Sequence, residues 1–294
     1  MKTKFVYFLP ILCGIMWGSA GIFVRTLSEM GMDSFTIVST RAMMAAITIL
    51  VGILCYDWKL LKIDIKDIWM FAGASVLGMF GVNICYNIAI EELTLSLAAV
   101  LLSMSPVFVL FLAAILFKEK ITRKKVGCML LALTGCVLVS GVLEASSNMQ
   151  WSVKGILLGV GCAFFYSLYN LFSKFAIEKG YHAATSSFYS MFIIMLMMLP
   201  MTNWQSADVI VKEKGVSIII FIFFHALCLS VLPSVLFTLS LKYIEAGKAA
   251  ILTSVEPVAA MVFGVLFFAE IPTVLSVSGL VLTLIALTIM TKSE

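Results

Sequence analysis

Glu256 occupies the position in this sequence that most requires a chemical explanation. It lies inside the apolar run LTSVEPVAAMV, residues 252–262, and Pro257 follows it directly. An unpaired carboxylate at the centre of a membrane helix costs about 2.5–3.5 kcal/mol on insertion scales. We therefore expect Glu256 to face protein or a wet cavity. It serves there either as a ligand for a cation or coupling proton, or as an acceptor for backbone hydrogen bonds.

Two further ionisable side chains, Arg41 and His225, lie deep in apolar stretches. The guanidinium of Arg41 is suited to binding a substrate carboxylate through two parallel hydrogen bonds. Pairing with Glu256 and a purely structural role are the alternatives for Arg41. An unperturbed histidine titrates near neutral pH, so His225 is a candidate proton carrier. A single structural hydrogen bond is the competing interpretation for His225.

Aromatic and amide side chains within the apolar stretches are candidates for lining a polar cavity. Aromatic faces suit an ammonium group through cation–π contact, and amides in a membrane helix need hydrogen-bond partners. Interfacial positions or packing between helices are the competing interpretation. The predicted substrate-binding residues of this kind are Trp17, Asn83, Tyr86, Tyr166 and Asn170.

Long apolar helices must position these residues. Of the 294 residues, 62% are hydrophobic and only 12% are charged, which is typical of a chain surrounded by lipid. A helix needs about 20 apolar residues to cross the hydrocarbon core. The sequence therefore predicts an all-α polytopic membrane protein with ten transmembrane helices, at about 5–27, 34–56, 68–90, 94–117, 125–143, 153–176, 184–202, 216–242, 246–269 and 274–291.

The distribution of basic residues predicts the orientation of these helices. Most of the 20 lysine and arginine residues fall in segments that share one side of the membrane, with the run KEKITRKK as the strongest cluster. Because basic loops stay inside, both termini are predicted to be cytoplasmic in the cell membrane. The first apolar run is longer than the core of a signal peptide, so it is predicted to be a retained span.

The chain repeats itself. Residues 97–122 align without a gap over residues 248–273, which matches Pro106 with Pro257. Residues 14–31 align over residues 163–180 in the same order. Five spans is an odd number, so a second copy enters the membrane in the opposite sense. We predict two inverted five-helix repeats, 1–145 and 146–294, with a substrate site between them near the midplane.

The repeated motifs resemble those of a known family. They are Ser105-Pro106-Val107 with Glu119 and Thr122, Glu256-Pro257-Val258 with Glu270 and Thr273, and also Trp17-Gly18 and Arg41. This pattern resembles the EamA family of the drug/metabolite transporter superfamily, over nearly the whole chain. The resemblance implies a transporter and leaves the substrate open among amino acids, quaternary amines, nucleotide-related metabolites and toxic compounds. It favours export, although some members import.

The predicted function is secondary active transport of a small polar metabolite, amino acid-like or quaternary amine-like, across the cytoplasmic membrane as an exporter. Alternating access is the predicted mechanism, with Pro106 and Pro257 as gating positions. Import by the same fold, a channel or a lipid scramblase are the alternatives. An intramembrane serine hydrolase built from Ser75 and His225 is a further alternative, for which no oxyanion donors can be argued.

The remaining features narrow the class of protein. The net charge of +4, with no basic cluster that carries interleaved aromatics, excludes nucleic acid as a predicted partner. The seven cysteines form no C-x-x-C pair, so neither a metal site nor a cofactor is predicted. We expect no enzyme activity. The expected partners are the substrate, the lipid bilayer and a coupling proton or ion, and the sequence leaves the oligomeric state open.

Overall fold

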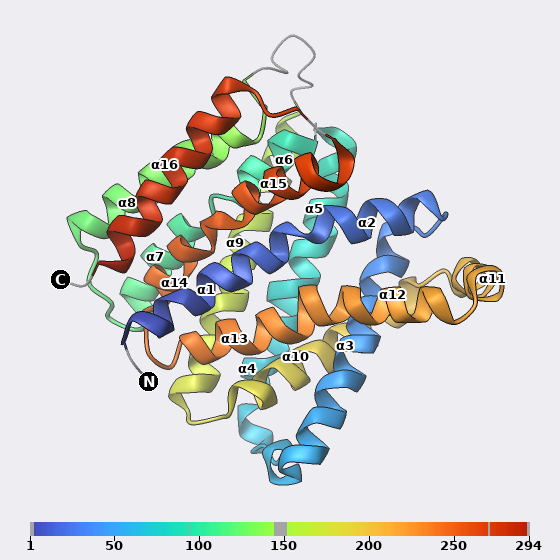
Figure 1. The fold of residues 1–294 in the computed structure, drawn as a ribbon. Helices are drawn as coiled ribbons and strands as arrows, with labels where there is room; N and C mark the ends of the chain where they lie inside the picture. Colours follow the sequence, from blue (N-terminus) through green and yellow to red (C-terminus); the bar gives the residue numbers. More distant parts are fainter. Residues whose placement is uncertain (1–2, 94, 144–151, 270, 293–294) are drawn as a thin grey trace.

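The fold was analysed in a computed structural model, which describes residues 3–93, 95–143, 152–269 and 271–292. The described residues form helices and connecting turns, with no strand among them. Figure 1 shows one helical bundle in which both termini lie at the same end. Glu270 of the second repeated motif and the predicted boundary between the repeats, after residue 145, lie outside the described residues.

The first half of the chain forms five successive helical spans, three of which are built from shorter pieces. In chain order they are α1 (Thr3–Gly18) with α2 (Ala20–Glu29); α3 (Ser34–Tyr56); α4 (Ile68–Ala72), the π-helix η3 (Gly73–Phe80) and α5 (Gly81–Glu92); α6 (Leu95–Leu102) with α7 (Ser105–Leu116); and α8 (Arg123–Val139).

The second half also forms five spans. These are α9 (Val153–Glu178); α10 (Ala183–Met198); α12 (Val216–Ala226), the π-helix η6 (Leu227–Val231) and α13 (Leu232–Ser240); α14 (Ala246–Leu252), the 3-10 turn η7 (Thr253–Val255) and α15 (Glu256–Phe268); and α16 (Val274–Thr291). The short helix α11 (Trp204–Lys214) connects α10 to α12.

The helices have the length and composition of membrane spans. Nine stretches of the described chain are long and apolar enough to cross a bilayer. The tenth predicted span is α8, which has 17 residues and so lies at the lower limit for crossing. The prediction of an all-helical membrane protein with ten spans is therefore confirmed.

The contacts between spans occur in corresponding pairs. The third span packs on the sixth, through η3 and α5 on α9, and its counterpart, the eighth span, packs on the first through α13 on α1. The fourth span packs on α9, and its counterpart, the ninth, packs on α1. The second packs on the seventh, and the fifth on the tenth. This is the pattern that a two-fold relation between the predicted repeats requires.

The fifth and tenth spans cross with their backbones in contact. A Cβ atom added to Gly135 of α8 would lie 2.2 Å from Thr283 Oγ1 of α16, and one added to Gly279 would lie 2.6 Å from the Gly135 carbonyl oxygen. Figure 1 shows the two helices side by side. Only glycine permits such an approach, so these two residues fix the position of this crossing.

The fourth and ninth spans are interrupted at matching places. In the fourth span, α6 ends at Leu102 and α7 begins with Ser105-Pro106. In the ninth span, η7 separates α14 from α15, which begins with Glu256-Pro257. Proline has no backbone donor and fits the first turn of a helix, so each proline begins a new helix inside the membrane.

Candidate functional site

The two interruptions border one cavity of about 450 Å³. This volume lies within the range of small-molecule binding sites. The break in the fourth span contributes Ser103, Ser105 and Pro106, and the break in the ninth contributes Thr253, Ser254, Glu256 and Pro257. Trp17, Tyr86 and Tyr166 complete the inner wall from the first, third and sixth spans. The cavity therefore lies between residues of both halves of the chain.

Trp17 is held in this wall by the way α1 packs on the ninth span. A Cβ atom added to Gly18 would lie 2.6 Å from the Ala259 side chain and 2.7 Å from the Glu256 carbonyl oxygen, so the two backbones nearly touch. The Trp17 indole donates a hydrogen bond to the Leu229 carbonyl of η6 at 3.2 Å. Pro233, four residues after Leu229, has no backbone N–H, so the Leu229 carbonyl lacks its α-helical donor and is open to Trp17.

Tyr86 and Tyr166 face the same part of the cavity. The Trp17 and Tyr166 rings meet edge to face, with their centroids 6.1 Å apart. Both tyrosines line this cavity together with Glu256. The structure thus brings Trp17, Tyr86, Tyr166 and Glu256 together, as a binding site requires. Their role in binding stays a prediction.

Glu256 occupies the first turn of α15 and is half-buried against the cavity. A helix N-terminus carries a partial positive charge, which favours a carboxylate at this place. Within the described part of the chain, Glu256 has neither a hydrogen bond nor an ion pair from another side chain, and it does not pair with Arg41. A carboxylate without a cationic partner, beside a cavity, is available to a ligand.

The other predicted binding residues lie away from the cavity. Asn83 donates a hydrogen bond of 2.7 Å to the Met79 carbonyl of its own span, and Asn170 is only 1% exposed. His225 is fully buried and stacks on Phe23, with ring centroids 5.2 Å apart. Neither Arg41 nor His225 borders the cavity. A binding role for these four residues is a prediction that this cavity does not support.

The hydrolase alternative requires Ser75 to contact His225. The Ser75 hydroxyl instead lies within hydrogen-bonding distance of two backbone carbonyls, at 2.8 and 2.9 Å, that of Phe71 in its own span and that of Ser190 in α10. Both ring nitrogens of His225 are buried without a hydrogen-bond partner. The serine hydroxyl and the histidine are therefore not assembled as a nucleophile and its base.

Sequence reasoning missed several lining residues. Arg25 lies at the exposed rim of the cavity, with its guanidinium over the Phe268 ring at 4.5 Å, whereas its place near a helix end predicts an interfacial anchor. Ser103 and Thr253 line the cavity because they lie in the two helix breaks. Their position beside Pro106 and Pro257 is the signal from which they could have been found.

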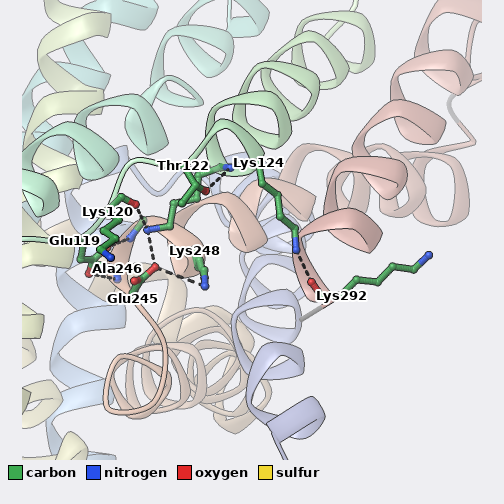
Figure 2. Close-up of polar contacts among 10 residues, drawn as sticks. Glu119, Lys120, Thr122, Lys124, Glu245, Ala246, Lys248 and Lys292 are labelled. Carbon is green, nitrogen blue, oxygen red and sulfur yellow. Dashed lines mark hydrogen bonds and ion pairs between the residues drawn. The ribbon is translucent and has the colours of Figure 1, made fainter. Parts of the chain in front are cut away.

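Polar contacts close the end of the bundle that carries both termini. The Glu119 carboxylate, after α7, accepts hydrogen bonds from the backbone N–H groups of Ala246 at 2.7 Å and Gly247 at 3.2 Å, at the start of α14 (Figure 2). Lys125, which is 1% exposed, pairs with Glu245 at 2.5 Å. These residues, Glu119, Lys125 and Glu245 to Gly247, form the terminal-end clamp, which joins the two halves of the chain.

Two more contacts strengthen this end. Lys125 also donates to the Lys120 carbonyl at 2.8 Å, and Lys124 donates to the Lys292 carbonyl at the end of α16 (Figure 2). The exposed lining residues Arg25 and Pro272 lie within α2 and just before α16. Figure 1 shows α2 and the start of α16 at the end of the bundle away from both termini. The bundle is thus hollowed towards the end opposite the termini and clamped at the end that carries them.

Comparisons with known proteins agree with this arrangement. The model of the EamA-like transporter family matches the chain twice, over residues 4–141 and 153–292. The uncharacterized transporter YwfM of Bacillus subtilis is 22% identical over 100% of this chain and 96% of its own. The uncharacterized transporter YetK of the same organism is 24% identical over 76% of this chain and 67% of its own.

Two other comparisons extend these findings. The pseudopaline exporter CntI of Pseudomonas aeruginosa is 25% identical over 72% of this chain and 71% of its own. The crystal structure of another protein, 14% identical, superposes with a TM-score of 0.75 over 98% of this chain and 95% of that one, which shows a shared fold. Since the family model covers nearly all of both halves, the chain belongs to the EamA-like transporter family.

Proposed function

We propose that this protein is a secondary active carrier that moves a small polar metabolite across the cell membrane. The observation that carries the proposal is the position of the cavity, between the breaks at Pro106 and Pro257 in corresponding spans of the two halves. Transporters built from repeats bind their substrates where such interrupted helices meet. The substrate site is then the wall formed by Trp17, Tyr86, Tyr166 and Glu256.

Alternating access follows from the contrast between the two ends of the bundle. One end is hollowed and the other is held by the terminal-end clamp, as expected of a carrier open to one side only. If both termini are cytoplasmic, this is the outward-open state. Reversal requires the clamp to break and the rim to close, with Pro106 and Pro257 as the places where the fourth and ninth spans bend.

Export is the proposed direction. Both the resemblance of the repeated motifs and the relative named as a pseudopaline exporter support it. The sequence contains no nucleotide-binding motif, so the proposed energy source is a proton or ion gradient, or exchange of substrates. Glu256, in the wall of the cavity, is the proposed site for a coupling proton.

Flux through reconstituted protein tests this proposal. Proteoliposomes loaded with a mixture of amino acids and amines are expected to release a subset saturably, whereas a channel would give flux that rises linearly with concentration. Replacing Lys120 and Glu245 by cysteine and joining them with a bismaleimide should abolish turnover, because the clamp can no longer open. Undiminished flux after crosslinking would refute alternating access.

A further inference from the structure

We propose that the cavity recognises a protonated amine that carries N–H donors, with Glu256 as its counter-ion. This inference rests on the cavity being the substrate site of the proposed carrier, and it adds the chemical class that this site selects. The charge of the wall is the first argument. Among the lining residues that the structure describes, Glu256 is the one carboxylate and Arg25 the one cation. The inner part of the cavity, which contains Glu256, is therefore negatively charged and suited to a cation.

The hydrogen-bonding capacity of the inner wall is the second argument. The Trp17 N–H is already engaged by the Leu229 carbonyl. The hydroxyl groups of Ser103 and Thr253 donate to backbone carbonyls of their own spans, at 2.9 and 2.8 Å. The lone pairs of these hydroxyls, the two carboxylate oxygens and the aromatic faces remain. Such a wall offers acceptors, and an ammonium group supplies only donors.

The tyrosines fit the same chemistry. Tyr86 and Tyr166 line the cavity together with Glu256, and a phenol hydroxyl can turn to present its oxygen to an N–H donor. Their rings, with that of Trp17, offer faces and edges to the carbon skeleton beside the charged nitrogen. A quaternary ammonium would satisfy the charge but would leave these oxygens without donors. The wall thus favours an amine with N–H groups over its fully methylated analogue.

The position of Arg25 argues against a small zwitterion. Arg25 packs on Phe268 at the C-terminal end of α15, whereas Glu256 begins that helix. The helix has 13 residues, so its ends are about 18 Å apart at 1.5 Å per residue. An α-amino acid whose ammonium contacts Glu256 would have to span much of this helix length to bring its carboxylate to Arg25. That carboxylate would instead lie near the like charge of Glu256, which costs binding free energy.

Four probes that share one carbon skeleton separate these possibilities. They are phenethylamine, phenylalanine, 3-phenylpropionate and the trimethylammonium analogue of phenethylamine. Isothermal titration calorimetry on the purified full-length protein should give the highest affinity for phenethylamine. Glu256→Gln should weaken phenethylamine binding about 10- to 100-fold, since it removes a charged hydrogen-bond partner. Glu213→Gln, the same change at an exposed position on α11, should leave the affinity unchanged.

The outcomes that overturn the inference are defined by the same titrations. Equal or tighter binding of the zwitterion, the anion or the quaternary analogue would refute it, as would no detectable binding of phenethylamine. An unchanged affinity in Glu256→Gln would also refute it. Glu256→Asp keeps the charge and should retain more affinity than Glu256→Gln, which guards against a variant that merely folds poorly. The ranking of probes on the unaltered protein is independent of any variant.

Flux measurements separate this inference from the proposed function. If phenethylamine binds but leaves proteoliposomes no faster than protein-free liposomes, the amine site is supported and the proposed carrier function is refuted. If phenylalanine or 3-phenylpropionate is transported saturably and the amine is not bound, the proposed carrier function is supported and the amine site is refuted.

Discussion

Loss of the Glu119 charge should open the end of the bundle that carries the termini. The perturbation is Glu119→Gln, which keeps one acceptor oxygen but removes the negative charge. Two charge-assisted hydrogen bonds, to the N–H groups of Ala246 and Gly247, become one neutral bond. Hydrogen bonds to charged groups contribute about 1.5–3 kcal/mol each and neutral ones about 0.5–1.5 kcal/mol. Because Glu119 is partly exposed, the lower end applies, and we expect a loss of about 2 kcal/mol.

This loss should change the balance between two conformations. The Glu119 bonds join the two halves of the chain, so they are broken when the halves separate at this end. A loss of about 2 kcal/mol then shifts the equilibrium about 30-fold toward the state in which this end is open. Overall folding should change less, since both states are folded.

Cysteine labelling measures this shift. Ile244 lies beside Glu245 at the clamp and is 8% exposed. In a background with Cys55 and Cys228 replaced by serine, Ile244→Cys should react slowly with a maleimide, and Glu119→Gln should accelerate the reaction about 30-fold. Asp208→Asn, which breaks an exposed pair on α11, is the control. Equal labelling rates with and without Glu119→Gln would refute the reasoning.

Two further predictions concern stability. Gly135→Ala should lower the free energy of unfolding by about 1–3 kcal/mol, because its Cβ atom would collide with Thr283, whereas Gly127→Ala in the same helix meets nothing within 4 Å; equal thermal melts would contradict this. Burial acts to raise the pKa of Glu245, but the hydrogen bond and charge of Lys125 outweigh it, so the pKa lies below the usual 4.5. A depressed folded pKa means that the stabilisation is present at neutral pH and is lost as the pH falls through that pKa. Between neutral and acidic pH, the melting temperature should therefore fall less for Glu245→Gln than for the unaltered protein. An equal fall in the two proteins would argue against this contribution of Glu245.

Hydropathy predicted the spans because contact with lipid requires apolar side chains along the whole length of each helix. The eighth span, predicted over 216–242, is helical from Val216 to Ser240. Some of the interruptions within the spans could be predicted from the sequence, since Pro106 and Pro257 mark two of them. The π-helices Gly73–Phe80 and Leu227–Val231 and the break at Ser19 were not predicted. Pro233, just after the second π-helix, is a local signal for that interruption, whereas Gly73–Phe80 and the region of Ser19 contain no proline.

The candidate site was predicted in part for a related reason. Sequence position gives the approximate depth of a residue in the membrane, and Trp17, predicted to line the cavity, does so in the structure. Sequence position does not give the direction in which a side chain points around its helix axis. That direction is set by the packing of whole spans, which turns Tyr86 into the cavity and leaves Asn83, three residues earlier on the same helix, bonded to its own backbone.

The crossing of α8 and α16 has a consequence for the surrounding lipid. These neighbouring helices have 17 and 18 residues, so each is about 26–27 Å long, while an average hydrocarbon core is about 30 Å thick. Leu130 of α8 and Val281 of α16 are exposed side chains on this flank. The acyl chains beside these helices must shorten or disorder to match the helix length, so the bilayer is thinner along this side of the protein. Such mismatch draws proteins toward thinner membranes and toward one another, which makes this flank sensitive to the chain length of the host lipids.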